Sequence, residues 1–305
     1  MNVLSHERRC RVIASLVDGM SLRAVERTTD VTLKTVGRLA LDVGEGCQRL
    51  HDRIMRDLTC AMLQFDEQHS WVHTRHDHVK DSDPDEWGEQ WAFFALDVAS
   101  RAKISALVGK RTAENTLAFV QDVRDRVLGT PTISSDGFKP YVDAVEIVFG
   151  ADCRFGQLVK QYDDDRPDAP RRPNHYKGAM PVPVIGGMRP DEINTSYLER
   201  ANLTHRLDSK RFTRRTLCFS KRLRNHAAAV WMHTTAYNFV RIHRSLRVTP
   251  AMALGVADHP WSISELVTLA LAEPPAAAPP PAVEPIPTGE PTRPVLRLIP
   301  GGRAG

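Results

Sequence analysis

The sequence has few cysteines, and they are not arranged to hold a metal ion or a disulfide framework. The five are scattered, their number is odd, and none pairs at a Cys-x-x-Cys spacing. We therefore expect neither a structural zinc knuckle nor a disulfide-stabilised fold, and the pattern fits a reducing compartment. The cysteines are Cys10, Cys47, Cys60, Cys153 and Cys218.

Long apolar runs are also missing. No stretch of about 18 apolar residues predicts a membrane span, and the first residues lack the cationic-then-apolar pattern of a secretory signal. We therefore expect a cytoplasmic chain. Its composition, 42% hydrophobic and 26% charged residues, is typical of a globular protein, and a length of 305 residues favours two domains.

Neither sign of charge dominates, because the formal net charge is only +4. The cations are nevertheless concentrated: the segment from Arg200 to Arg224 holds nine of them and a single acid, Asp208. Such a segment predicts a surface that binds a polyanion, the alternative being a solvated helix face. The nine are Arg200, Arg206, Lys210, Arg211, Arg214, Arg215, Lys221, Arg222 and Arg224.

Residues 1–50 have the pattern of three short helices. Ser5, Ser21 and Thr32 are each placed to cap a helix, and apolar residues at helical spacing follow each of them. Three such helices with tight connections predict a helix-turn-helix whose third helix enters a groove of DNA. Its groove-facing candidates are Lys34, Thr35 and Arg38. A small helical bundle without DNA-binding activity is the alternative.

After a linker at residues 51–60, residues 61–255 have the pattern of a mixed α/β domain. Three apolar runs predict an antiparallel meander, namely Ala61–Thr74, Gln90–Val98 and Ile104–Val108. A helix capped by Thr112, a strand at Pro131–Ser135, a helix at Tyr141–Phe149 and a strand at Phe155–Tyr162 follow. The order βββαβαβ predicts a ribonuclease-H-like domain with a five-stranded mixed sheet flanked by helices, although other α+β domains share pieces of this order.

The rest of the chain contains an insertion, further helices and a tail. Residues 163–190 are rich in Asp, Pro, Arg and Gly, which predicts an inserted loop. Helices are expected at Tyr197–Leu207 and Lys221–Val240, and a C-terminal helix within residues 256–272. The Pro- and Ala-rich residues 273–305 predict a disordered tail.

Three acidic residues are candidates for metal ligands. Asp66 is set in an apolar strand, where burial costs free energy unless the carboxylate is paired or metal-bound. Asp136 ends the fourth strand before Gly137, a common place for site residues, although Asp-Gly also forms simple turns. Glu199 lies on a predicted helix, where in isolation it would be a surface residue. Carboxylates from separate elements suit a pair of Mg²⁺ ions, which can activate a nucleophile on a phosphodiester.

Several neighbouring residues compete for roles in this site. Glu67 follows the first aspartate in the strand and should point to the opposite face. Asp97 is the main rival as a ligand, and we expect it at the site rim or in a strand-end turn. We interpret Asn238 and His243 as packing residues rather than general bases or phosphate contacts. The histidines of His69–His78 predict a solvated hairpin more than a metal site.

The segment from Thr195 to Arg206 resembles the glutamate motif of the insertion-sequence-one family of DDE transposases. Three later segments are similar to downstream blocks of that family, namely Phe219–Lys221, Tyr237–Arg247 and Thr249–Ala253. Phe65-Asp66-Glu67 with Trp71 resembles its first-aspartate strand, and Ser135-Asp136-Gly137 with Tyr141 resembles its second-aspartate turn. The resemblance spans roughly residues 60 to 255, with the motifs in the right order.

This resemblance implies a catalytic core in which Asp66, Asp136 and Glu199 bind two Mg²⁺ or Mn²⁺ ions and catalyse DNA cleavage and strand transfer. It also implies double-stranded DNA as the partner, both element ends and target, a homo-oligomer on DNA, and action at the nucleoid of a prokaryotic cell. Two features depart from the family. Typical members carry an N-terminal cysteine zinc finger, which this chain lacks, and the second aspartate and the glutamate are 63 positions apart (199 minus 136), wider than is typical.

The basic segment follows Glu199 closely, so we expect it to neutralise DNA phosphates that lead into the site. Its candidate contacts are Arg200, Arg206, Lys210, Arg211, Arg214 and Arg215. Two other functions remain open: a nuclease of the same fold that only hydrolyses DNA, and a non-catalytic helix-turn-helix regulator. Three acidic residues at the three ligand positions argue against the regulator.

Overall fold

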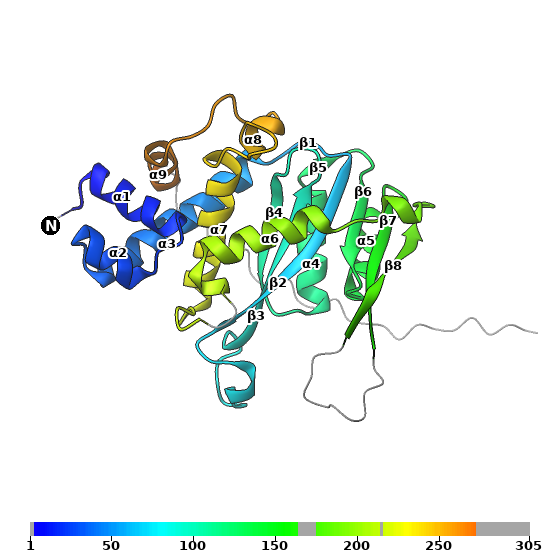
Figure 1. Ribbon diagram of the computed structural model, residues 1–305, viewed down its shortest axis with the longest axis horizontal. Helices are drawn as coiled ribbons and strands as arrows, with labels where there is room; N and C mark the ends of the chain where they lie inside the picture. The colour runs from blue at the N-terminus through cyan, green and yellow to red at the C-terminus, as the bar shows by residue number, and fades with distance from the viewer. Residues whose placement is uncertain (1–2, 164–174, 214–215, 273–305) are drawn as a thin grey trace, which may run out of the picture. The chain divides into compact units, whose positions relative to one another are not determined.

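A six-stranded mixed sheet forms the centre of the computed structural model, which describes residues 3–163, 175–213 and 216–272 (Figure 1). Its strand order is β4-β3-β2-β6-β7-β8. The first three strands along the chain form an antiparallel meander, β6 pairs parallel with both β2 and β7, and β8 runs antiparallel to β7. The strands are β2 (Met62–Val72), β3 (Gly88–Asp97), β4 (Lys103–Gly109), β6 (Thr132–Asp136), β7 (Arg154–Asp163) and β8 (His175–Ile185).

The order of elements βββαβαβ is confirmed, and the arrangement is consistent with a ribonuclease-H-like fold. The predicted number of five strands is wrong, because β8 forms within the segment that the sequence predicts to be a loop. This strand contains Pro181 and Pro183, and it lies at the edge of the sheet, where a proline is tolerated because one side of the strand needs no hydrogen-bond donors. The predicted insertion at residues 163–190 is therefore partly a hairpin strand; its residues 164–174 lie outside the described residues.

Helices cover both faces of the sheet. One face is apolar: Phe65 of β2 packs on Phe119 of α4 (Ala113–Arg124) and on Tyr141 of α5 (Pro140–Phe149), with ring centroids 5.4 and 5.8 Å apart. Thr112 caps α4 as predicted, since its hydroxyl accepts a hydrogen bond from the Asn115 N–H. The other face carries α6 (Ser196–Asp208), which crosses β2, and α7 (Leu223–Phe239), which packs on β4 (Figure 1).

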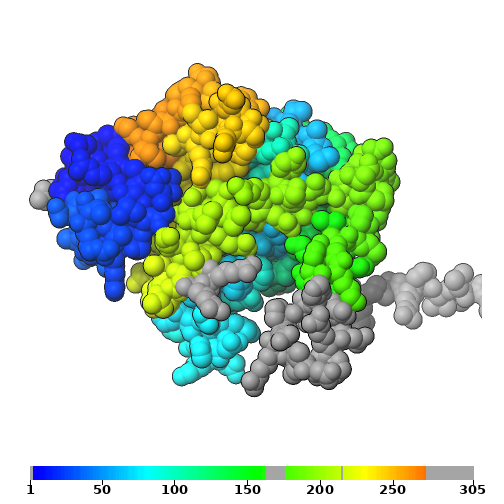
Figure 2. Space-filling view, viewed as in Figure 1, coloured from blue at the N-terminus to red at the C-terminus, as the bar shows by residue number. Residues whose placement is uncertain are grey.

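The N-terminal residues form α1 (His6–Val17), α2 (Leu22–Thr29) and α3 (Leu33–Ile54). Ser5 and Ser21 cap the first two helices as predicted, whereas Thr32 makes no side-chain cap and its hydroxyl bonds Thr35 instead. The third helix is 22 residues long, so residues 51–54 of the predicted linker are helical. Its length is explained by packing, because it lies along α7 and also contacts α9 (Ile263–Ala272). Figure 2 shows the N-terminal helices (blue) against the last helix (orange).

The remaining elements are short. Two short strands form a separate parallel sheet: one lies in the predicted linker and the other follows α4. One short helix precedes the last helix. No helix among the described residues is long and apolar enough to cross a membrane. All five cysteines are free thiols, and the tail predicted for residues 273–305 lies outside the described residues. The short elements are β1 (Leu58–Thr59), β5 (Val127–Leu128), α8 (Pro250–Ala253), and the 3₁₀ turns His76–His78, Pro190–Glu192 and Lys210–Phe212.

Two glycines let α3 approach its neighbours closely. A Cβ at Gly46 would lie 1.9 Å from the Ala270 carbonyl oxygen of α9, and one at Gly44 would lie 2.3 Å from the Ala228 carbonyl oxygen of α7. These contacts are with backbone, which cannot move aside as a flexible side chain does. The glycines therefore set the distance between the N-terminal helices and the rest of the protein.

We expect Gly46→Ala to lower the free energy of unfolding by about 1–3 kcal/mol, because the added methyl group overpacks the contact with α9. Gly37→Ala is the matched control, since Gly37 lies on the same helix with nothing within 4 Å of the added atom. There the better helix propensity of alanine should stabilise by up to about 1 kcal/mol. Chemical denaturation measures both, and equal stabilities of the two variants would contradict the close packing of α3 on α9.

Candidate active site at the centre of the sheet

Polar side chains on one face of β2 hold α6 in place. Gln64, Asp66 and Gln68 alternate along the strand, so all three point to the face that α6 covers. Each of these side chains accepts a hydrogen bond from a different part of α6, and together the three bonds fix the helix along its length. The bonds are from the Leu198 N–H to Gln64 Oε1 (2.9 Å), from Asn202 Nδ2 to Asp66 Oδ2 (2.8 Å) and from His205 Nδ1 to Gln68 Oε1 (2.6 Å).

The parallel pairing of β2 with β6 brings Asp136 beside Asp66. Phe65 is in register with Ser135, so the two aspartates follow directly on neighbouring strands. Asp136 is the last residue of β6, and its Oδ1 accepts a hydrogen bond from the Phe138 N–H in the turn that follows. Oxygens of Asp66, Asp136 and Glu67 all lie within 4.8 Å of one another. This is the one group with metal-ligand spacing in the described part of the chain.

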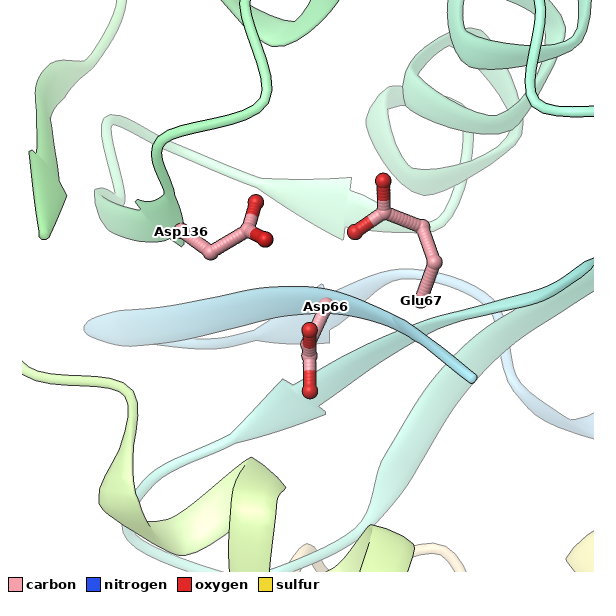
Figure 3. A group of neighbouring side chains, drawn as sticks. All are labelled: Asp66, Glu67 and Asp136. Atoms are coloured by element: carbon pink, nitrogen blue, oxygen red, sulfur yellow. The ribbon is translucent and has the colours of Figure 1, made fainter. Parts of the chain in front are cut away.

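Glu67 approaches this group from the other side of β2. Figure 3 shows its carboxylate and that of Asp136 directed at each other, while Asp66 points to the opposite side of the strand. The prediction that Glu67 points to the opposite face is therefore confirmed. Its side chain is fully buried, and its Oε1 accepts a 2.8 Å hydrogen bond from Arg111 Nε. The Arg111 guanidinium also stacks over the ring of Phe138 at 3.9 Å and lies 3.7 Å from Asp136 Oδ2.

Burial and mutual repulsion make these carboxyls hard to ionise. Burial, and next the charge of Asp136, raises the pKa of Asp66 to about 6 and that of Glu67 to about 8. Burial also raises the pKa of Asp136 above its usual range, although the hydrogen bond from Phe138 and the charges of Arg111 and Lys160 oppose this rise. A site that concentrates negative charge in this way favours a bound cation.

Glu199 lies in the first turn of α6, close enough to Asp136 for its charge to raise the pKa of that aspartate, after burial as the main cause. Its carboxylate is not within the 4.8 Å group. Instead, Glu199 Oε1 accepts a 2.8 Å hydrogen bond from Lys160 Nζ of β7 and a 3.4 Å bond from the Thr195 hydroxyl. The structure thus brings two of the three predicted ligands together, whereas the third, Glu199, is paired with Lys160 outside this group.

Sequence reasoning missed the residues that support this site. A signal for α6 docking is present in the sequence as polar residues at every second position of β2, namely Gln64, Asp66 and Gln68. No comparable signal marks Arg111 or Lys160, because they lie on separate elements and reach the site only through the fold.

The predicted DNA-binding residues occupy different environments. Lys34, Thr35 and Arg38 are exposed at the start of α3, Arg200 and Lys210 are exposed on and just after α6, and Arg206 is half-buried. Arg211 is half-buried; burial lowers its pKa, and its guanidinium donates a 2.6 Å hydrogen bond to the Ser220 hydroxyl. This bond connects the segment after α6 to the residues before α7, and DNA binding by Arg211 stays a prediction. Arg214 and Arg215 lie outside the described residues.

The rival residues have structural roles. Asp97 is buried and accepts hydrogen bonds from the backbone N–H and hydroxyl of Ser100, so it forms the predicted strand-end turn. Asn238 bonds both backbone groups of Lys103 and so fixes α7 to β4. His243 lies in the turn after α7, where its ring bonds the Ser245 hydroxyl. In the β2–β3 hairpin, His69 packs on Trp91 and His73 stacks on Trp87, while His76 and His78 are exposed.

The residues present fit a divalent cation. The three candidate ligands and Glu67 offer hard oxygen atoms, which Mg²⁺ and Mn²⁺ prefer. Two buried oxygens beside the site, Glu67 Oε2 and Asn202 Oδ1, have no hydrogen-bond partner. An unpaired buried acceptor is costly, so a cation or its bound water beside such an oxygen would stabilise it.

Comparisons with known proteins give little further information. No family model matches this sequence, and no curated protein matches it. Among solved structures, the chain is similar to the piggyBac transposase in a cryo-EM structure of its synaptic complex with hairpin DNA. The TM-score is 0.37 and the identity 12%, over 87% of this chain and 69% of that one. A similarity of this size carries no weight for function, so the likeness to the insertion-sequence-one family remains a prediction from sequence motifs.

Proposed function

We propose that this protein is a DDE transposase that cleaves DNA and joins its strands with the help of divalent metal ions. One observation supports the proposal: Asp66 and Asp136 lie on neighbouring parallel strands with carboxylate oxygens within 4.8 Å of each other, and Glu199 lies in the first turn of α6, the helix that packs on β2. This arrangement joins residues that are far apart in the sequence, and they are the three residues that the sequence motifs single out.

Asp66, Asp136 and Glu199 would hold two Mg²⁺ or Mn²⁺ ions, which when bound polarise a phosphodiester and activate the attacking water or 3′-hydroxyl. The protein's own contribution is to position these carboxylates. Asn202 orients Asp66 through its 2.8 Å hydrogen bond, and the Phe138 N–H orients Asp136. Arg111 holds Glu67 on the far side of β2 and limits the repulsion between Glu67 and Asp136.

The N-terminal helices would bind DNA through the exposed start of α3. Replacing Lys34 and Arg38 together with glutamine should weaken DNA binding and reduce the slope of log affinity against log salt by about two, because each phosphate contact contributes about 0.9. Arg75→Gln with Lys80→Gln, two exposed cations on the β2–β3 hairpin, is the control and should leave the slope nearly unchanged. Fluorescence anisotropy with duplex DNA measures both slopes, and equal slopes would contradict this binding mode.

The function is tested with an element-end duplex, a supercoiled target and Mg²⁺. A transposase yields 3′-end cleavage followed by a covalent product that joins end to target. Cleavage without joined product would assign a nuclease, and DNA binding without cleavage would assign a regulator. Because joining requires two DNA ends at once, we also expect a homo-oligomer on DNA.

A further inference from the structure

Lys160 lies beside the acidic residues, although none of the sequence motifs contains it. Strand β7 continues beyond the end of β6, and Asp136 is in register with Leu158, so Lys160 lies two residues further along the same face. That face is covered by α6. The ammonium group thereby reaches Glu199 in the first helical turn, 2.8 Å away.

The Lys160 charge acts on all three proposed metal ligands. It forms an ion pair with Glu199, and it is close enough to Asp66 and Asp136 to favour their ionised forms. The pair is also accessible, because 41% of the Lys160 side chain and 44% of the Glu199 side chain are exposed. A half-exposed pair of this kind is weak and exchanges readily.

We propose that Lys160 is a positioning residue that serves as the exchangeable counter-ion of Glu199: it holds this carboxylate beside Asp136 in the metal-free protein and releases it when a divalent cation binds. The inference rests on the proposed function, because it assumes that Glu199 is a metal ligand. Lys160 keeps the third ligand in place at the cost of competing with the metal for it. A lysine suits this task since its ammonium is a compact point charge on a flexible stem.

The consequence is that removing the lysine charge should strengthen metal binding. In Lys160→Met the stem keeps its length, while the cation that competes for Glu199 is gone. We expect the affinity for Mn²⁺ to rise roughly two- to fivefold, the range that an exposed ion pair supports. Lys160→Arg keeps the positive charge and should bind Mn²⁺ as the wild type does.

The experiment is a calorimetric titration of Mn²⁺ into the full chain at about pH 8, with thermal unfolding in chelator as a check of folding. Lys139→Met is the matched control, because Lys139 is exposed three residues after Asp136 and its loss should not change the affinity. Asp136→Asn should bind Mn²⁺ much more weakly than the wild type, which identifies the site.

The outcomes separate the two proposals. Tighter binding in Lys160→Met alone supports the counter-ion role. Unchanged or weaker binding in that variant, with Asp136→Asn impaired, overturns the counter-ion role and leaves the proposed metal site intact. Binding that Asp136→Asn does not affect, or no binding by the wild type, overturns the metal site and the counter-ion role together.

Discussion

Asp136→Asn should reduce metal-dependent DNA cleavage by about 10³-fold, because a catalytic metal contributes several kcal/mol of transition-state stabilisation and each 1.36 kcal/mol is a factor of ten in rate. Asparagine keeps the size of the side chain and one oxygen, so it can still accept the hydrogen bond from the Phe138 N–H. What it removes is the negative charge. The measurement is single-turnover nicking of supercoiled DNA at saturating Mg²⁺.

The stability of this variant separates catalysis from folding. Burial raises the pKa of Asp136, which means that its ionised form is unfavourable in the folded protein. The neutral side chain should therefore be no less stable than the wild type in chelator. Asp143→Asn, an exposed acid on the following helix, is the control and should keep full activity. Full activity in Asp136→Asn would exclude this residue from the site.

Lys103→Met should raise the free energy of unfolding by about 1–4 kcal/mol, the range found when buried charged groups are replaced by well-packed apolar ones. Lys103 is fully buried on β4, and its Nζ has no hydrogen-bond partner. Its ammonium lies over the ring of Phe94, 3.8 Å from the centroid, and Tyr237 is 5.5 Å away. These ring contacts offset only part of the cost of burying the charge, whereas methionine fills similar space without it.

The free energy of unfolding that Lys103→Met gains over the wild type should depend on pH. Burial lowers the pKa of Lys103 to about 7, and the charge of Asp208 opposes this shift. In the unfolded chain the pKa returns to about 10.4. Below about pH 7 the charge is buried on folding and the penalty is fully present; between about pH 7 and 10 the folded protein releases a proton that the unfolded chain keeps, so wild-type stability rises with pH. The advantage of methionine is therefore largest below about pH 7 and shrinks above it.

Denaturation of both proteins between about pH 6 and 9 measures this difference. Lys110→Met is the control, since Lys110 is less buried and donates a 2.6 Å hydrogen bond to the Trp87 carbonyl. It should not gain stability, because that bond is lost. If Lys103→Met is less stable than the wild type at every pH, the Lys103 ammonium has a stabilising partner in the folded protein, and the prediction is wrong.

The central sheet was predictable from local patterns because its inner strands obey them. The meander strands each contain a short apolar stretch, and the helix caps Ser5, Ser21 and Thr112 form the bonds expected of them. Strand β8 was not predictable, because its prolines are typical of loops and only its position at the sheet edge permits them. The length of α3 was missed for a related reason: its last residues, 51–54, belong to the predicted linker, and packing of this helix along α7 and α9 is not visible in the local sequence.

The candidate site also contains some residues that the sequence predicts and others that it does not. Asp66 and Asp136 were predictable, since each lies at a recognisable point of a strand, and the fold brings them together. Glu199 was proposed from a motif and is found in the first turn of α6, but its partner Lys160 was not foreseen. Neither was the approach of Glu67 to Asp136 from the far face of β2, because side-chain alternation alone separates Glu67 from Asp66. Long side chains can meet past the end of a short neighbouring strand, here β6, and only the three-dimensional arrangement reveals this.

The most direct test of the metal site is the anomalous scattering of Mn²⁺ in crystals of the full chain soaked with the ion. We predict density for Mn²⁺ bound to Asp66, Asp136 and Glu199, with Glu199 released from Lys160. An ion held by Asp66, Glu67 and Asp136 while Glu199 stays on its lysine, or no ion at the end of β6, would contradict the proposed catalytic triad.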